Sequence, residues 1–167
     1  MAESIALFLK RGAAPSTDEI QGESSLTAGG REHSIEVLSL SQPLQAAFDR
    51  ATLQPTGRRF YPPLTFTKRI DKSTPLLRRA IVQNEALNGE FKWFRPNPAG
   101  TGTDQHFLTL FVDQARIVKC VTRLPDVLTP ATASLPPYEE IELVFHKIRW
   151  TYIDGGVEFE DELGSTS

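Results

Sequence analysis

Three histidines and a single cysteine are the side chains with the greatest capacity for acid–base, nucleophilic or metal chemistry in this sequence. His33, His106 and His146 lie far apart, and none has a second histidine or a cysteine at the short spacing that is typical of zinc ligands. Cys120 has no neighbouring base that would generate a thiolate. We therefore expect surface or hydrogen-bonded histidines, a small half-buried cysteine and no metal site.

Carboxylates and glycines also occur in groups that resemble functional motifs. Glu139, Glu140 and Glu142 could act as paired carboxylates, but we expect them at a solvated strand entrance. Residues 100–104 are glycine-rich but lack the lysine and the helix of a phosphate-binding loop, so they predict a turn. The sequence contains no GxSxG or GxGxxG motif either. We predict no catalytic, cofactor-binding or metal-binding residues, and hence a protein that is not an enzyme.

Three aromatic residues are of the kind that stacks on nucleic-acid bases: Trp93, Trp150 and Tyr152. They alternate with other residues at the period of a β-strand, and we therefore expect them in the core.

The stretch around which the chain is organised, residues 64–77, combines a strand, a turn and the start of a helix. Leu64, Phe66 and Ile70 alternate with polar residues, which predicts a half-buried strand. Thr74 is the predicted N-cap of the following helix, and Pro75 fits its first position because no N–H is needed there.

The predicted helix has an apolar face formed by Leu77, Ala80 and Ile81. Asn88 and Gly89 are its predicted end, because glycine tolerates the left-handed conformation that ends helices.

Other segments alternate or are apolar in the way that predicts strands: residues 4–10, 35–41, 90–95, 106–112, 115–123 and 138–154. Within residues 35–41 and 138–154 the apolar residues switch from one face of the predicted strand to the other, which indicates a bulge or burial on both faces. Val157 and Phe159 are expected to add a short edge pairing. Seven or eight strands and one main helix predict a mainly β fold, a small antiparallel β-barrel of two sheets with one flanking α-helix. Strands that are apolar on both faces pack either against loops and the helix or against another subunit.

Residues 43–62 form an unusually long connection between two predicted strands. We predict a short helix over residues 42–54, followed by Arg58, Arg59, Phe60 and Tyr61. Arginines and aromatic residues dominate interface energetics, so these four residues are candidates for an interface anchor. Burial of the two aromatic rings in the local core is the alternative.

Size and charge limit the classes of protein to which the chain can belong. A length of 167 residues predicts a single domain over residues 1–163, with residues 164–167 as a disordered tail. No apolar run is long enough to cross a bilayer, and no signal-peptide pattern is present, so we expect folding in the cytoplasm and no membrane insertion.

Residues 50–80 carry a net charge of +7, whereas residues 138–167 carry −6. The asymmetry indicates nucleic-acid binding, complementary patches between copies, or pairing of the two segments within one fold.

The stretch that organises the chain also resembles the signature of a known family, through Phe66, Thr67, Lys68, Asp71, Lys72, Ser73, Thr74 and Pro75. Residues 20–24 (Ile-Gln-Gly-Glu-Ser) and 35–41 resemble the segment after the family's first strand and its second strand. Residues 144–152 resemble its closing strand through Lys147, Trp150 and Tyr152. Four motifs in order over nearly the whole chain are similar to the Hcp (haemolysin-coregulated protein) family, the tube protein of bacterial type VI secretion.

The resemblance implies a homohexameric ring that stacks on other rings into the inner tube of a contractile injection apparatus. It implies a spike protein, a sheath and small effectors as partners, with no cofactor and no nucleic acid. Assembly would take place in the bacterial cytoplasm, and the tube would then be secreted with the spike. The family's extended loop, which contributes to ring stacking, would correspond to residues 43–62, with Arg58, Arg59, Phe60 and Tyr61 as its stacking residues.

Three alternatives are retained. A bacteriophage-like tail tube protein shares the architecture, and a free ring could act as an effector-binding chaperone. A nucleic-acid-binding barrel would use Arg58, Arg59, Arg78 and Arg79, with an affinity that falls steeply with salt.

Overall fold

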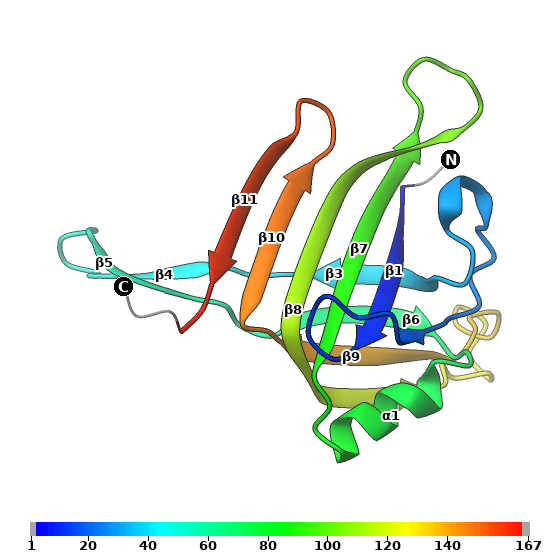
Figure 1. Cartoon of the computed structure of the whole chain (residues 1–167). Helices are drawn as coiled ribbons and strands as arrows, with labels where there is room; N and C mark the ends of the chain where they lie inside the picture. The colour runs from blue at the N-terminus through cyan, green and yellow to red at the C-terminus, as the bar shows by residue number, and fades with distance from the viewer. Residues whose placement is uncertain (1–2, 165–167) are drawn as a thin grey trace.

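The longest strand, β8 (Asp104–Arg123), joins the two halves of the sheet in the computed structural model, which describes residues 3–164 (Figure 1). Its first part pairs with β7 and β10, and its second part pairs with β9. Gln114 lies between the two parts in the left-handed backbone region, at φ 49°. The strands predicted over residues 106–112 and 115–123 are therefore one continuous strand, bent by a bulge at Asp113 and Gln114.

Six strands close into a barrel in the order β8-β7-β1-β3-β6-β9-β8, with every pairing antiparallel. The bounds of these and the remaining elements are β1 Ser4–Arg11, β2 Glu19–Ile20, the 3₁₀-helix Ala28–Gly30, β3 Ile35–Ser41, β4 Gln45–Phe48, β5 Pro55–Phe60, β6 Leu64–Arg69, α1 Thr74–Val82, β7 Leu87–Pro96, β9 Tyr138–Val144, β10 Lys147–Tyr152 and β11 Val157–Glu162. Strands β10 and β11 extend the sheet beyond the closed barrel. The predicted fold class is confirmed.

The long strand predicted over residues 138–154 is two strands. The chain breaks at Phe145 and His146, opposite the bulge of β8, so that β9 pairs with β6 while β10 pairs with β11. This break explains why the apolar residues change phase. The bulge predicted in residues 35–41 is confirmed between Val37 and Ser39, and the edge pairing predicted at residues 157–159 is confirmed as β11.

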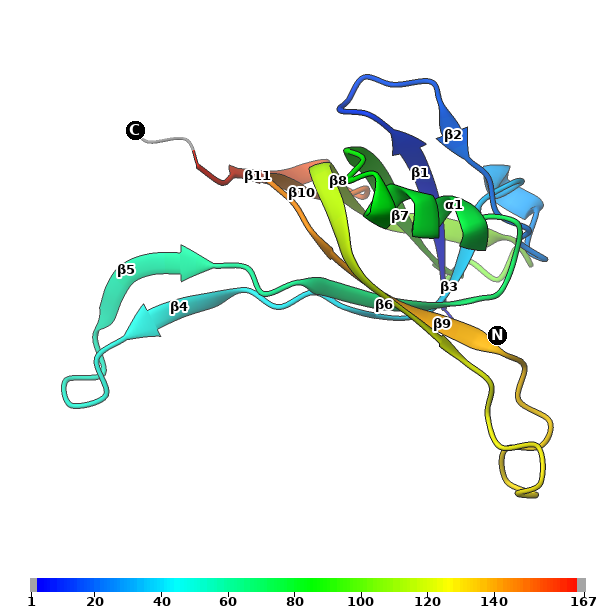
Figure 2. The ribbon, with the colours of Figure 1, turned by 90° about the horizontal axis from the view of Figure 1, so that it is seen from below.

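The helix predicted over residues 42–54 is wrong, because this segment forms β4 and the turn that connects it to β5 in a hairpin. The Asp49 carboxylate accepts hydrogen bonds from the N–H groups of Ala51 and Thr52, and Leu53 adopts φ 57°. Such side-chain bonds to nearby backbone groups favour a turn over a helix. Figure 2 shows this hairpin and the loop between β8 and β9 projecting from opposite sides of the barrel.

Helix α1 begins and ends earlier than predicted. Its N-cap is Ser73 and not Thr74, although Pro75 does lie in its first turn. Asn84, at φ 49°, follows the end of the helix and provides the left-handed residue. The predicted end at Asn88 and Gly89 is wrong, since both residues lie in β7.

The core fills the barrel with apolar side chains from the strands and from Leu77 and Ala80 of α1. Ile70 was expected in this core but is 39% exposed, because β6 ends one residue earlier. Trp150 is partly buried and packs against the core, as expected. Trp93 is partly buried outside the core cluster, and Tyr152 is 38% exposed, so the prediction of a core position for Tyr152 is wrong.

Candidate functional site

A fully buried lysine lies at the centre of the signature stretch, residues 66–75. Lys68 occupies the inward face of β6, in line with the buried Leu64 and Phe66. Its ammonium group donates to the Asp71 carboxylate at 2.9 Å and lies 2.5 Å from Glu139 Oε1. A lysine takes this position because two carboxylates and a backbone carbonyl satisfy its three donors.

Glu139 is the second buried charge of this cluster. Its side chain is 0% exposed and accepts hydrogen bonds from Arg78 of α1 at 2.9 Å and from Thr74 at 3.1 Å, in addition to the contact with Lys68. The expectation that Glu139 lies at a solvated strand entrance is wrong. Glu140 and Glu142 of the same strand, in contrast, are partly exposed and pair with Arg123 and Lys119.

The turn between β6 and α1 is held by the remaining polar groups of the signature. The Asp71 carboxylate accepts from the N–H and hydroxyl of Ser73. The Thr74 hydroxyl accepts from the N–H of Asp71 at 3.2 Å. The N–H of Glu23 reaches Asp71 at 3.4 Å and so connects the Gly-Glu-Ser segment to this turn.

Gly22 of that segment is required by close packing. A Cβ atom at this position would lie 2.6 Å from the Ser34 carbonyl oxygen and 2.7 Å from the Cα of Ile35. Because both are backbone atoms, they cannot move aside as a flexible side chain can, and only glycine fits.

The buried cluster is a structural centre. Two cations, Lys68 and Arg78, oppose two anions, Asp71 and Glu139, and every ammonium and carboxylate is engaged by a partner. A general base or nucleophile needs a free lone pair that faces a substrate. This cluster therefore fixes β6, β9 and α1 relative to one another.

The other signature residues have different surroundings. Phe66 is buried and contacts the edge of Phe91, with ring centroids 5.5 Å apart, and Thr67 shares a hydrogen bond with Ser39. Lys72 and Pro75 are exposed.

In the closing segment, Lys147 pairs with Glu160 at 3.0 Å. Trp150 packs against the core, while Tyr152 contacts Phe107.

The four candidate interface residues divide into two pairs. Arg59 forms a two-point ion pair with Asp161 of β11, and the Tyr61 hydroxyl donates to the same carboxylate at 2.8 Å. Arg58 and Phe60 instead face solvent, and Phe60 is 49% exposed. Thus one aromatic residue packs locally, and the other is free for an interface.

The Tyr61 phenol provides a pH-dependent marker of this contact. Burial and its hydrogen bond to Asp161 raise the pKa of Tyr61 to about 12. We expect ultraviolet titration at 295 nm to show a tyrosinate component near pH 12 that Tyr61→Phe removes. Since this pKa is raised above its ordinary value of 10.0, the contact stabilises the fold below pH 10 and is lost as the pH rises through about 12.

Circular dichroism at each pH is the control for this titration, because global unfolding would expose the phenol. Retention of the high-pH component in Tyr61→Phe would show that another tyrosine carries it.

The histidines and the cysteine do not form a site. His33 and His146 are exposed, and burial lowers the pKa of the half-buried His106. Cys120 is half-buried as expected, and burial raises the pKa of its thiol. Among residues 3–164, no group of three or more His, Cys, Asp or Glu side chains could hold a metal ion.

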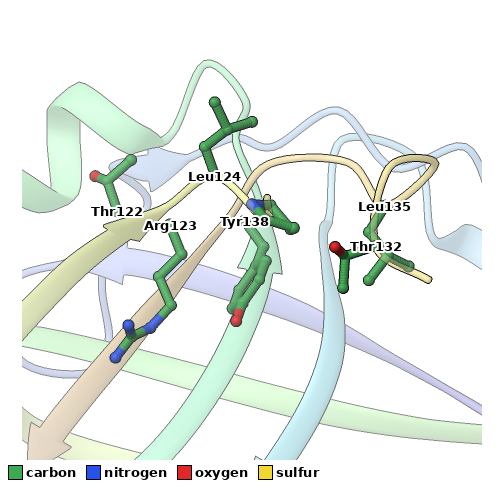
Figure 3. Close-up of a pocket in the computed structure, with 7 residues that line it drawn as sticks. Thr122, Arg123, Leu124, Thr132, Leu135 and Tyr138 are labelled. Carbon is green, nitrogen blue, oxygen red and sulfur yellow. The ribbon is translucent and has the colours of Figure 1, made fainter. Parts of the chain in front are cut away.

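An open groove of about 530 Å³ lies beside the loop between β8 and β9 (Figure 3). Its lining is formed by Thr122, Arg123, Leu124, Pro125, Thr132, Leu135 and Tyr138. The Arg123 guanidinium is already paired with Glu140 at 3.0 Å. This lining offers apolar and hydroxyl contacts, but it has no carboxylate, histidine or cysteine for chemistry.

The basic and acidic segments meet within the chain. Arg59 pairs with Asp161, and Lys68 and Arg78 pair with Glu139, so the pairing that we considered between residues 50–80 and 138–167 is confirmed. Arg79 also pairs with Glu85. Three of the four arginines proposed to bind nucleic acid are thus neutralised by carboxylates, which weakens that alternative.

Exposed apolar side chains concentrate in three segments of the described chain. They are Leu44, Phe48, Leu53 and Phe60 around the hairpin; Leu124, Val127, Leu128 and Leu135 in the loop after β8; and Tyr152, Ile153, Val157 and Phe159 in β10–β11. Large exposed apolar surfaces mark sites of interaction.

Within residues 3–164, no helix is long and apolar enough to span a membrane.

Comparison with known proteins identifies a family and relatives that are similar to this sequence. Residues 12–152 match the family described as "Type VI secretion system effector, Hcp". The "Major exported protein" of Pseudomonas aeruginosa is 30% identical over 134 residues, which cover 80% of this chain and 77% of that protein.

Solved structures show the same fold. Hcp1 from Escherichia coli EAEC 042, solved as a double mutant, is 30% identical with a TM-score of 0.81, and the match covers 96% of this chain and 99% of that one. Secreted protein Hcp3 from Pseudomonas aeruginosa is 21% identical with a TM-score of 0.72, over 98% and 100% of the two chains.

The family match favours the secretion family over the bacteriophage-like alternative, and this is a family of secreted structural proteins rather than of enzymes. The family match covers residues 12–152, which is most of the chain, and the structure has the barrel fold that the sequence predicted. The chain therefore belongs to the Hcp family of type VI secretion.

Proposed function

We propose that this chain is a subunit of the inner tube of a type VI secretion apparatus, in which six copies form a ring and rings stack end to end. The tube is expelled with its spike when the sheath contracts, and its lumen holds small effectors. Subunits assemble in the bacterial cytoplasm and leave the cell with the tube.

The uncovered apolar face of β10–β11 is the observation that supports this proposal most strongly. Val157 lies opposite Tyr152, and Phe159 lies opposite Trp150, on the face that continues the barrel interior. The two strands extend past the closed barrel (Figure 1). Val157 and Phe159 therefore remain 67% and 62% exposed. A neighbouring copy that packs on this face would remove the apolar surface from water.

The distribution of exposed surfaces fits a ring. The β4–β5 hairpin and the loop between β8 and β9 project from opposite sides of the barrel (Figure 2). Head-to-tail contacts between copies require two different surfaces on each subunit, and such contacts close into a ring when the rotation allows it.

The hairpin contributes to stacking through Arg58 and Phe60 in this proposal. Both side chains are exposed, and an arginine beside an aromatic ring is a common anchor of interfaces. Arg59 and Tyr61, which we also assigned to the stacking loop, act indirectly because Asp161 engages them within the chain.

Absolute mass from light scattering after gel filtration, with negative-stain images of the same peak, tests the proposal. We expect the mass of six chains and annular particles. A monomer at high concentration would contradict the tube function. Rings that never associate end to end would contradict the stacking role and favour a free ring that acts as an effector chaperone.

A further inference from the structure

The β4–β5 hairpin has little intrinsic support for a fixed direction. Within residues 3–164 its two strands pair only with each other, and all ten of their residues are exposed. An isolated two-stranded hairpin is marginally stable in water. A surface that meets a neighbouring copy must nevertheless be held in one orientation before binding. Otherwise the conformational entropy that is lost when the surface becomes ordered weakens assembly.

A three-point contact at the base of the hairpin supplies the missing support. Arg59 Nε and Nη2 donate to the two carboxylate oxygens of Asp161, each at 2.6 Å, and the Tyr61 hydroxyl donates to the same group at 2.8 Å. The Asp161 side chain is only 11% exposed. The Tyr61 ring also contacts Phe145 edge-on, with centroids 5.4 Å apart.

This geometry differs from that of an ordinary surface ion pair. The planar guanidinium matches the carboxylate at both oxygens, which fixes direction as well as distance. Isolated exposed pairs contribute little, but a two-point pair on a mostly buried carboxylate with a third donor is the favourable exception. The partners are 102 residues apart in sequence, so the contact joins otherwise separate parts of the chain.

We propose that Asp161 is a positioning residue for assembly. It fixes the β4–β5 hairpin to β11, so that the exposed surface of the hairpin and the exposed apolar face of β10–β11 meet neighbouring copies as one rigid unit. The assembly half of this inference rests on the proposed tube function, whereas the fixing of the hairpin can be tested without it. The path of the chain agrees, since the end of β11 lies beside the base of the hairpin (Figure 1).

Hydrogen–deuterium exchange of the full chain tests the first half. In Asp161→Asn, which keeps the shape but removes the charge, we expect the hairpin amides to exchange about tenfold faster or more. Arg59→Lys keeps the charge but loses the two-point fork and should give a smaller effect of the same sign. Glu158→Gln is the matched control on the same strand, because Glu158 contacts Arg149 and Thr151 of β10 rather than the hairpin, and its hairpin exchange should equal that of the wild type.

Assembly is measured on the same variants by light scattering over a dilution series. We expect Asp161→Asn to need about tenfold higher concentration than the wild type to reach the same mass distribution. The exchanged pair Arg59→Asp with Asp161→Arg should restore both slow exchange and assembly.

The outcomes separate the two proposals. Unchanged hairpin exchange in Asp161→Asn would overturn the positioning role. Faster exchange with unchanged assembly would overturn the link to assembly. If the wild type itself stays monomeric, the tube function fails, while the exchange data still decide whether Asp161 fixes the hairpin.

Discussion

Replacing Glu139 by glutamine is expected to lower the free energy of unfolding by about 3–5 kcal/mol, the typical cost of removing one partner of a buried ion pair. Glutamine has nearly the same shape, so packing is retained. Lys68 and Arg78 would lose their shared anion, and Lys68, with 0% of its side chain exposed, could not recover the loss from water. Urea denaturation followed by tryptophan fluorescence, at a fixed protein concentration, measures the change.

Glu140→Gln provides a matched control on the same strand. Glu140 pairs with Arg123 at the surface, where the Arg123 side chain is 50% exposed, and we expect loss of this solvent-screened pair to change the free energy of unfolding far less. Equal effects of the two substitutions would contradict the structural role that we assign to the buried cluster.

Phe159→Asp is expected to produce the second largest effect, the loss of ring assembly with the barrel intact. Phe159 is 62% exposed in the single chain, so an aspartate there costs the monomer little. In the proposed ring the same carboxylate would be buried without a partner, which costs several kcal/mol at each interface. We expect light scattering to report monomers at concentrations where the wild type forms rings, with an unchanged circular dichroism spectrum.

Val82→Asp serves as the control for this experiment. Val82 is 83% exposed at the end of α1, outside the three segments in which exposed apolar residues concentrate. Isolated exposed apolar residues of this kind need no partner. Persistence of rings in Phe159→Asp would exclude the β10–β11 face from the subunit interface.

Local pattern was sufficient where neighbouring residues decide the structure. Alternation of Phe66 with polar residues correctly located β6, and the Ser-Thr-Pro run located the start of α1 to within one residue. Local pattern failed at residues 42–54. Leu44, Ala47 and Phe48 follow helical spacing, but all three are exposed, and the turn at Asp49 forms instead of a helix. The apolar residues switch to the other face after Phe145, which indicated an irregularity at this point. The pattern did not reveal that the chain breaks there into two strands, β9 and β10, with different partners.

The sequence by itself determined the mainly β fold, the start of the helix and the membership of the family, because these depend on periodicity and on motifs that are contiguous in the chain. Only the tertiary structure decided which charges are buried and paired. Lys68 and Glu139, like Arg59 and Asp161, lie far apart in sequence, and burial of a charge is favourable only when folding brings its partner within hydrogen-bond distance. The alternation of β9 places Glu139 in phase with the buried Ile141 and Leu143, and Glu140 on the opposite face. Only the tertiary structure shows that Lys68 and Arg78 pair with Glu139, so that its charge can be buried.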